Sequence, residues 1–214
     1  MSDLWSERAQ LYRESAAHRE GPDLDVLVEW VEQAGASTAL DVATGGGHVA
    51  RRLRDIGVKV VTTDAAPGMQ PDVITRAEHL PFDDGSFDAV VSRVAHHHFD
   101  DPGAAVDEMA RVSGAFVAVV DNLFMSDEAE EAYCLRDPSH VRNYTEDEWR
   151  AMFESAGLRV DDVRHFDKPI EFQPWLDRVG CEGGDAQRVR ELLADRIDDG
   201  WVRLERIALK GLKT

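Results

Sequence analysis

The sequence predicts an α/β fold in three layers, in which a seven-stranded, mostly parallel sheet with an antiparallel edge strand lies between two layers of helices. Short apolar runs typical of buried strands alternate with amphipathic segments typical of helices, which is the pattern of successive strand–helix–strand units. The chain has 214 residues, a length that suits a single domain of this kind. We therefore expect one domain over residues 1–214.

The expected elements follow from these runs in order. The strands are expected over residues 38–43, 59–63, 73–74, 87–92, 115–121, 159–165 and 201–212, and the helices between them over 24–34, 48–56, 102–112 and 145–156. Thr145 is a plausible N-cap for the last helix, because Glu148 three residues later completes a capping box.

Two further segments fall outside this alternation. Residues 4–17 form an amphipathic pattern that we expect to be an extra helix over the carboxyl edge of the sheet. Residues 122–143 are too long for a simple loop, and inserted segments of that length are usually lids or binding elements. The domain is accordingly divided into a helical cover (1–35), a core (36–121), a lid (122–144) and the remaining helix and edge strands (145–214).

The net charge, the apolar runs and the cysteines of the chain indicate what kind of partner it binds and where it is located. A net charge of -18 repels nucleic-acid phosphates and anionic membranes, so we expect a small-molecule partner and no binding to nucleic acid or membrane. No apolar run approaches the roughly 20 residues that span a bilayer, and the charged N-terminus lacks the apolar core of a signal peptide. Cys134 and Cys181 have no metal-ligand spacing and are expected to be reduced thiols in a cytoplasmic protein. The oligomeric state stays open.

A glycine turn follows the first expected strand. Thr44, Gly45, Gly46 and Gly47 connect this strand to a helix that begins at His48, so backbone and free helix N–H groups can approach a ligand closely. Such a turn at the carboxyl edge of a parallel sheet is typical of a nucleotide site. The spacing of Gly45, Gly47 and Ala50 also fits the dinucleotide pattern, so a NAD-dependent oxidoreductase is an alternative.

Two acidic residues lie at the ends of neighbouring strands. Asp41, just before the turn, would repel a pyrophosphate and attract a cationic ligand. Asp64, at the end of the second strand, can bind both hydroxyls of a ribose. It is therefore consistent with a nucleoside site but does not distinguish one ribose-containing ligand from another.

Four motifs carry a resemblance to a known family. They are the D-x-x-x-G-x-G turn of Asp41–Gly47, the acid Asp64 that ends strand two, the A-E-x-L-P-F-x-D-x-S-F-D run of residues 77–88, and the paired His97 and His98. With them the sequence resembles class I S-adenosylmethionine-dependent methyltransferases of the ubiquinone/menaquinone-biosynthesis type, a Rossmann-like family, most strongly over residues 36–121. The stretch 137–142 resembles a subgroup whose substrate the sequence does not identify.

The resemblance implies a set of cofactor contacts for S-adenosylmethionine and its product S-adenosylhomocysteine. Asp41 and the turn would hold the methionine end, Asp64 the ribose, and the remaining residues the adenine and the methionyl chain. The implied cofactor-binding residues are Asp41, Ala43, Thr44, Gly45, Gly46, Gly47, Asp64, Ala65, Met69, Ala77, Glu78, Ser92 and Arg93, with Tyr12 added from the N-terminal cover. Arg76 departs from the family, in which an Asp or Asn often reads the adenine.

Candidates for the chemistry come from the histidine run and the lid. Methyl transfer is an in-line displacement that depends mainly on positioning and needs a base only where the acceptor loses a proton. We consider His97, His98, His140 and Tyr144 as catalytic residues and Arg142 and Asp137 as acceptor-binding residues, although the lid residues could equally form a network that only holds the lid together. We expect no metal, because on an extended segment at most His96 and His98 could converge and no second ligand cluster exists.

The leading hypothesis is therefore transfer of a methyl group to a small-molecule acceptor. Besides the oxidoreductase, a non-catalytic protein that binds the cofactor but lacks an acceptor site stays an alternative. The sequence leaves open whether carbon, oxygen or nitrogen is methylated.

Overall fold

The three-layer α/β fold predicted from the alternation of elements is confirmed by the structure, a computed structural model that describes residues 5–6, 9–10, 13 and 19–214. The helices are α3 (Pro22–Gln33), α4 (His48–Asp55), α5 (Pro102–Val112), α6 (Asp127–Arg136), α7 (Glu146–Ser155), α8 (Phe172–Asp177) and α9 (Gly183–Leu192), with short 3-10 turns η1 (Pro67–Met69), η2 (His96–His98) and η3 (Ala194–Arg196). The strands are β1 (Thr38–Val42), β2 (Lys59–Asp64), β3 (Val73–Ile74), β4 (Phe87–Arg93), β5 (Ser113–Asn122), β6 (Leu158–Glu171), β7 (Ile197–Asp198) and β8 (Trp201–Lys213).

The sheet is parallel across its first five strands. The order is β3-β2-β1-β4-β5-β8-β6, and β7 pairs with β8 as an additional eighth strand. β8 runs antiparallel to β5, and β6 pairs antiparallel with β8 at the edge. The order of the strands reverses at β1, which has β2 on one side and β4 on the other. Open α/β sheets bind their ligands at such a switch point, in the crevice at the carboxyl ends of the strands.

Alternating side chains of the strands build two hydrophobic cores, one on each face of the sheet. In β1, Leu40 and Val42 belong to the core that includes α5 and α7, whereas Ala39 belongs to the core that includes α3 and α4. This period of two follows from the pleat of a strand. At the start of α7, Thr145 and Glu148 form the expected capping box.

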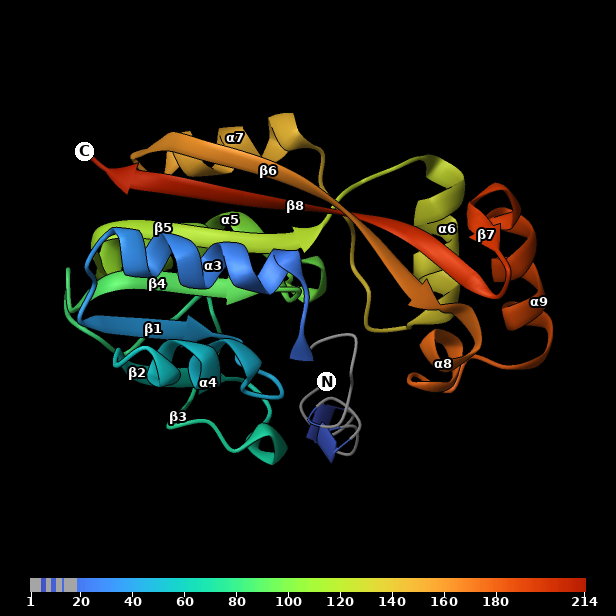
Figure 1. The fold of residues 1–214 in the computed structure, drawn as a ribbon, viewed down its shortest axis with the longest axis horizontal. Coiled ribbons are helices and arrows are strands. Elements are labelled where there is room, and N and C mark those ends of the chain that lie inside the picture. The colour runs from blue at the N-terminus through green and yellow to red at the C-terminus, as the bar shows by residue number, and fades with distance from the viewer. Residues whose placement is uncertain (1–4, 7–8, 11–12, 14–18) are drawn as a thin grey trace.

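A smaller lobe extends beyond the carboxyl edge of β5 (Figure 1). We call it the cap: it consists of α6, α8, α9, η3, β7 and the adjoining ends of β6 and β8, and it has a hydrophobic core of its own around Tyr133, Trp175 and Leu204. The predicted lid, residues 122–144, contributes only α6 to the cap, because residues 170–204 supply the rest. The division of the chain into domains stays a prediction.

The N-terminal region contributes at two places. The described residues Trp5 and Ala9 pack against Ala66 and Met69, next to the end of β2, whereas α3 lies on a face of the sheet instead of over its edge. Tyr12 and most of the helix expected over residues 4–17 lie outside the described residues. Within the part of the chain that is described, no helix combines the length and apolarity that crossing a membrane requires.

Candidate active site

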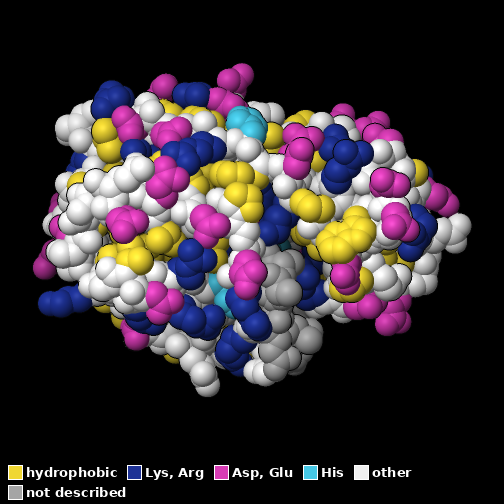
Figure 2. All heavy atoms as spheres, in the orientation of Figure 1, with side chains coloured by type: hydrophobic (Ala, Val, Ile, Leu, Met, Phe, Trp, Pro, Cys, Tyr) yellow, Lys and Arg dark blue, Asp and Glu magenta, His cyan; other side chains and the backbone are white. Residues whose placement is uncertain are grey.

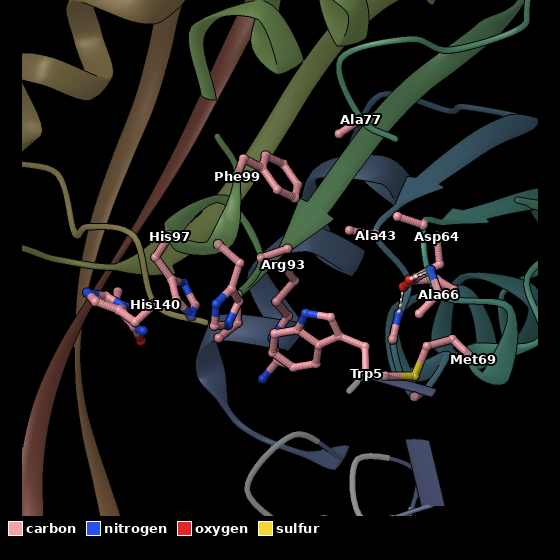
Figure 3. Close-up of a pocket in the computed structure, with 18 of the residues that line it drawn as sticks. Trp5, Ala43, Asp64, Ala66, Met69, Ala77, Arg93, His97, Phe99 and His140 are labelled. Atoms are coloured by element: carbon pink, nitrogen blue, oxygen red, sulfur yellow. Dashed lines mark hydrogen bonds between the residues drawn. The ribbon is translucent and has the colours of Figure 1, made fainter. Parts of the chain in front are cut away.

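A cavity of about 560 Å³ lies between the carboxyl edge of the sheet and the cap. This volume falls in the range of roughly 300–1,000 Å³ typical of small-molecule sites. Figure 3 shows Asp64, Ala66 and Met69 on one side of the cavity and His97 and His140 on the other, with Trp5 and Arg93 between them. The strand ends thus bring the glycine turn and the histidine run, which are about fifty positions apart in the chain, to one space.

The glycine turn is held in a left-handed backbone conformation. Ala43, Gly45 and Gly47 have φ values of 55°, 50° and 72°, and Gly47 is the N-cap of α4. A Cβ added to Gly45 or Gly47 would meet nothing within 4 Å, so backbone conformation and not space requires glycine here. Ala43 adopts the same region with a side chain, which is a source of local strain. Ala43, Thr44, Gly45 and Gly46 border the cavity, whereas Gly47 does not.

Asp41 is buried beneath the turn. Its Oδ2 accepts hydrogen bonds from Thr44 Oγ1 at 2.6 Å and from the backbone N–H of Ala50 at 3.1 Å, and the residue is 1% exposed. Burial raises the pKa of Asp41 to about 6, although these two hydrogen bonds act in the opposite direction. Asp41 borders the cavity. A positive charge bound nearby would lower its pKa and ionise the carboxyl fully.

Asp64 connects the turn to the loop after β2. Its Oδ2 accepts from the backbone N–H of Gly45 at 3.0 Å and its Oδ1 from that of Ala66 at 2.9 Å. Burial raises the pKa of this carboxyl as well. Ala65 and Met69 border the cavity beside it.

The third part of the predicted cofactor site lies in the loop after β3. Ala77 and Glu78 both border the cavity. Arg76, where the sequence departs from the family, contacts Glu78 at 3.0 Å and Asp100 at 2.7 Å. Arg76 also borders the cavity, and its ion pair holds the carboxylate of Glu78 beside it.

A histidine–aspartate pair lies on the opposite side of the cavity. His97 Nδ1 is 2.5 Å from Asp121 Oδ1, and the backbone N–H of His97 donates to Asp121 Oδ2 at 3.0 Å. Burial would raise the pKa of Asp121, but the charge of His97 and its hydrogen bond outweigh burial and hold that pKa at about 2. An ionised carboxylate can only accept, so Nδ1 carries the proton and Nε2 is left for another partner.

His98 and His140 complete the histidine side. His98 Nδ1 donates to the carbonyl of Ser139 at 3.0 Å, and burial together with the neighbouring His97 holds its pKa well below the usual range. His140 Nε2 is 2.8 Å from Glu130 Oε1, and burial lowers the pKa of its ring. Both rings border the cavity, and the centroids of the His97 and His140 rings are 5.5 Å apart.

The assumption that the histidine run is extended, with at most His96 and His98 on one side, is wrong. The segment is the 3-10 turn η2 instead of an extended strand, so successive side chains diverge by about a third of a turn. His96 is buried, its two ring nitrogens have no hydrogen-bond partner among the described residues, and its ring packs against Trp149 at a centroid distance of 5.2 Å. His97 and His98 are the two that border the cavity.

Several predicted site residues lie away from the cavity. Arg142 pairs with Glu148 at the start of α7 and lies over the ring of Tyr144, so neither side chain borders the cavity. Ser92 is fully buried within β4. Asp137 does border the cavity, but its Oδ1 accepts from the N–H and hydroxyl of Ser139, which gives it the role of holding the lid turn.

Sequence reasoning missed a group of basic and aromatic side chains. Arg206, Arg136, Arg178, Tyr133 and Trp175 border the cavity from β8 and the cap, and Asp121 supports His97 from β5. Asp121 stands at the carboxyl end of a predicted strand, which is a signal that could have identified it. The others lie in elements far apart in the chain, so only the tertiary structure brings them together.

One group of side chains within the described residues has metal-ligand geometry. One ligand atom each of Glu130, Cys134 and His140 lie within 4.8 Å of one another. The Glu130 carboxylate already accepts hydrogen bonds from the backbone and side-chain amides of Asn143, in addition to its contact with His140. The absence of a metal stays a prediction.

Comparison with known proteins agrees with this geometry. A family model described as a methyltransferase domain matches residues 40–117. The chain is 32% identical over 199 residues to a Bacillus subtilis methyltransferase named YcgJ, and the match covers 82% of this chain and 78% of the relative. The crystal structure of YcgJ is similar with a TM-score of 0.79 at 27% identity, over 89% of this chain and 97% of that one. A magnesium protoporphyrin IX methyltransferase from Synechocystis, solved with bound S-adenosylmethionine, shares the fold at 12% identity, with a TM-score of 0.56 over 89% of this chain and 78% of its own.

Proposed function

The chain belongs to the methyltransferase family, and we propose that it transfers a methyl group from S-adenosylmethionine to a small-molecule acceptor bound under the cap. One observation carries this proposal: a single cavity is bordered by the glycine turn and Asp64 on one side and, on the other, by His97, whose ring is paired with Asp121. A donor and an acceptor can therefore meet in one enclosed space, which supplies much of the acceleration of a two-substrate reaction.

The residues of the sheet edge fit S-adenosylmethionine. Asp64 lies where a carboxylate can bind two ribose hydroxyls, and Ala65, Met69 and Ala77 offer small or apolar surface for an adenine. Asp41 and the turn would hold the cationic methionine end, since a buried carboxyl favours a positive partner over a pyrophosphate. When bound, S-adenosylmethionine supplies an electrophilic methyl group on a sulfonium.

His97 is suited to remove a proton from the acceptor. Asp121 fixes the Nδ1–H tautomer, so the lone pair of neutral His97 is on Nε2 and can accept a proton from an acceptor O–H, N–H or acidic C–H. The charge that then forms on the imidazole is stabilised by the adjacent carboxylate. His98 and His140 line the same side and would orient the acceptor.

The assignment to the ubiquinone/menaquinone-biosynthesis type is part of this proposal and is supported by the run of residues 77–88. A small-molecule acceptor, as opposed to a nucleic acid, is supported by the net charge of -18 and by the covered cavity.

The test is a turnover assay in which the purified protein receives S-adenosylmethionine and a fractionated metabolite extract, and S-adenosylhomocysteine is quantified by mass spectrometry. With an active fraction, His97→Gln should lower kcat by roughly 10²–10⁴-fold while leaving S-adenosylhomocysteine affinity unchanged. His165→Gln is the matched control, because His165 is an exposed histidine paired with Glu146 on the outer surface. Full activity of His97→Gln would refute the role of His97, and no turnover in any fraction would count against the enzyme itself.

A further inference from the structure

The cavity is charged differently on its two sides. Acidic residues outnumber basic ones at the strand ends and their loops, where Asp41, Asp64, Glu78 and Asp100 border the cavity with Arg76 and Arg93. Basic residues outnumber acidic ones on the cap and β8 side, where Arg136, Arg178 and Arg206 border it with Asp137. Figure 2 shows Lys and Arg side chains in the furrow between the two lobes. Such an arrangement is notable in a chain with a net charge of -18. The acidic side suits a cationic donor, and the basic side requires an explanation of its own.

We propose that the methyl acceptor is an organic carboxylate with an apolar body, and that Arg206 and Tyr133 bind its carboxylate group. This inference rests on the proposed function, because it names the chemical class of the second substrate. It uses a part of the cavity that the donor site and the histidine pair leave open.

Arg206 presents an unused edge of its guanidinium. The side chain is only 3% exposed, and its Nη1 donates a hydrogen bond to the carboxylate of Asp23. Among the described residues, Nε has no hydrogen-bond partner and Nη2 donates to none. Nε and Nη2 form the edge that binds a carboxylate through two parallel hydrogen bonds. A buried guanidinium with this edge unpaired is unfavourable unless a ligand supplies the acceptors.

The carboxylate that holds Arg206, that of Asp23, is surrounded by positively charged side chains. Asp23 is fully buried and also accepts from Arg93 at 2.6 Å and Lys168 at 3.2 Å. One carboxylate thus serves three cationic side chains in the described structure. Asp121, the carboxylate at the end of the neighbouring strand, is engaged by His97. A further anion beside Arg206 would offset this excess of buried positive charge.

Tyr133 supplies a second donor of the same kind. Its hydroxyl is buried and has no partner among the described residues, while its ring stacks on His140 with a centroid distance of 5.2 Å. The apolar surfaces of Trp175, Ile170 and Leu204 border the cavity nearby and fit the body of an amphiphilic acid. Two unpaired donors beside an apolar wall are the elements of a carboxylate site.

The sheet separates this site from the methionine end of the donor. Arg206 pairs with Asn122 in the register of β8 and β5, and β5 in turn pairs with β4. With strands about 4.8 Å apart, β8 lies roughly 10 Å from β4 and roughly 14 Å from β1. The backbone of Arg206 is thus two to three strands from the donor's methionine end, while its guanidinium meets that of Arg93 at Asp23 Oδ2, so binding of a carboxylate to protein already saturated with S-adenosylhomocysteine distinguishes the two sites.

The experiment measures binding to the protein saturated with S-adenosylhomocysteine. Benzoate, phenylacetate and octanoate are titrated by calorimetry up to roughly 10 mM, each beside its uncharged primary amide. We expect each carboxylate to bind about tenfold or more tightly than its amide, which is the effect of a charge-assisted pair. Arg206→Gln should bring this ratio close to one, and Tyr133→Phe should weaken carboxylate binding severalfold without changing amide binding.

Controls and contrary outcomes separate this proposal from the proposed function. Arg188→Gln, which removes an exposed arginine paired with Glu131, should keep the wild-type ratio. Thermal melting checks that Arg206→Gln folds, and Tyr133→Phe removes only an unpaired hydroxyl. Equal binding of carboxylates and amides, or of neither, would overturn the proposal, and so would loss of S-adenosylhomocysteine affinity in either variant. Failure of the wild type to bind S-adenosylhomocysteine would instead refute the proposed function.

Discussion

Protonation of Asp41 should couple cofactor binding to pH. Its pKa of about 6 means that about half of the unliganded molecules carry this proton at pH 6. A sulfonium and an ammonium next to the carboxyl favour its ionised form and lower the pKa. Binding of S-adenosylmethionine at pH 6 should therefore release up to about half a proton, and at pH 7 about a tenth.

The same linkage predicts the affinity. Between pH 7 and pH 5, the dissociation constant for S-adenosylmethionine should rise about tenfold, because at pH 5 the carboxyl must first lose its proton. The α-amino group of the ligand, with a pKa near 7.7–8.0, stays charged throughout this window. Titration calorimetry in buffers of different ionisation enthalpy measures both the released proton and the affinity.

The matched variant is Asp41→Asn, whose amide oxygen can still accept from Thr44 and Ala50. Asp64, the other buried carboxyl with a raised pKa, is still present in this variant. Any proton release that the variant retains therefore comes from Asp64. Because the folded pKa of Asp41 is raised, its contribution to stability is present below about pH 4 and is lost as the pH rises through 6. The variant should thus bind more weakly, without the pH dependence, yet be more stable at pH 7 by up to about 3 kcal/mol. Equal proton release from the variant and the wild type would show that Asp41 is not the group that titrates on binding.

Three further predictions concern stability and are measured by urea denaturation. Asp121→Asn should lower the free energy of unfolding at pH 7 by about 2 kcal/mol and, since the folded pKa is depressed, this difference should vanish as the pH falls from 4 through 2; a constant difference would contradict it. Ala43→Gly should raise stability by about 1 kcal/mol by relieving a φ of 55°, and a loss would show that the turn is unstrained. Gly21→Ala should cost more than about 2 kcal/mol, because its φ of 137° and ψ of 159° lie in a region that essentially only glycine adopts and its Cβ would lie 2.6 Å from Oδ1 of the buried Asp23, whereas Gly35→Ala, at a φ of 62° with open space around it, should cost only about 1 kcal/mol; equal losses would contradict this difference.

The parallel core was predictable because its signals are local. Each of the seven predicted strands and the four predicted helices corresponds to an observed element within a few residues, except that β6 continues to Glu171, beyond the expected end at His165. The additional residues of β6 pair with β8 all the way to Glu171↔Trp201. That extension carries the cap, and nothing in the alternation of short runs distinguishes it from a loop.

The cap was less predictable because its packing is not local. α6 has acidic residues in its first turn, and its inward side chains Ala132 and Tyr133 pack on elements about forty to seventy residues later. Without those partners the segment shows no strong helical periodicity, so it was expected only as a lid. The same absence of local signal hid Arg206, whose ion-pair partner Asp23 lies more than 180 residues earlier in the chain.

The site was predictable where chemistry and position in the sheet agree. Asp41, Asp64 and His97 follow or end strands, so their placement at one edge follows from the parallel order. Arg142 was misplaced because a polar residue in an inserted segment has no such constraint, and its pairing with Glu148 depends on where α7 begins.

Which cofactor the protein binds is decided by a calorimetric titration with S-adenosylhomocysteine and, separately, with NAD. We expect saturable binding of S-adenosylhomocysteine that Asp64→Ala weakens by tenfold or more, through loss of the hydrogen bonds to the ribose, together with no binding of NAD. Tight binding of NAD without binding of S-adenosylhomocysteine would contradict it.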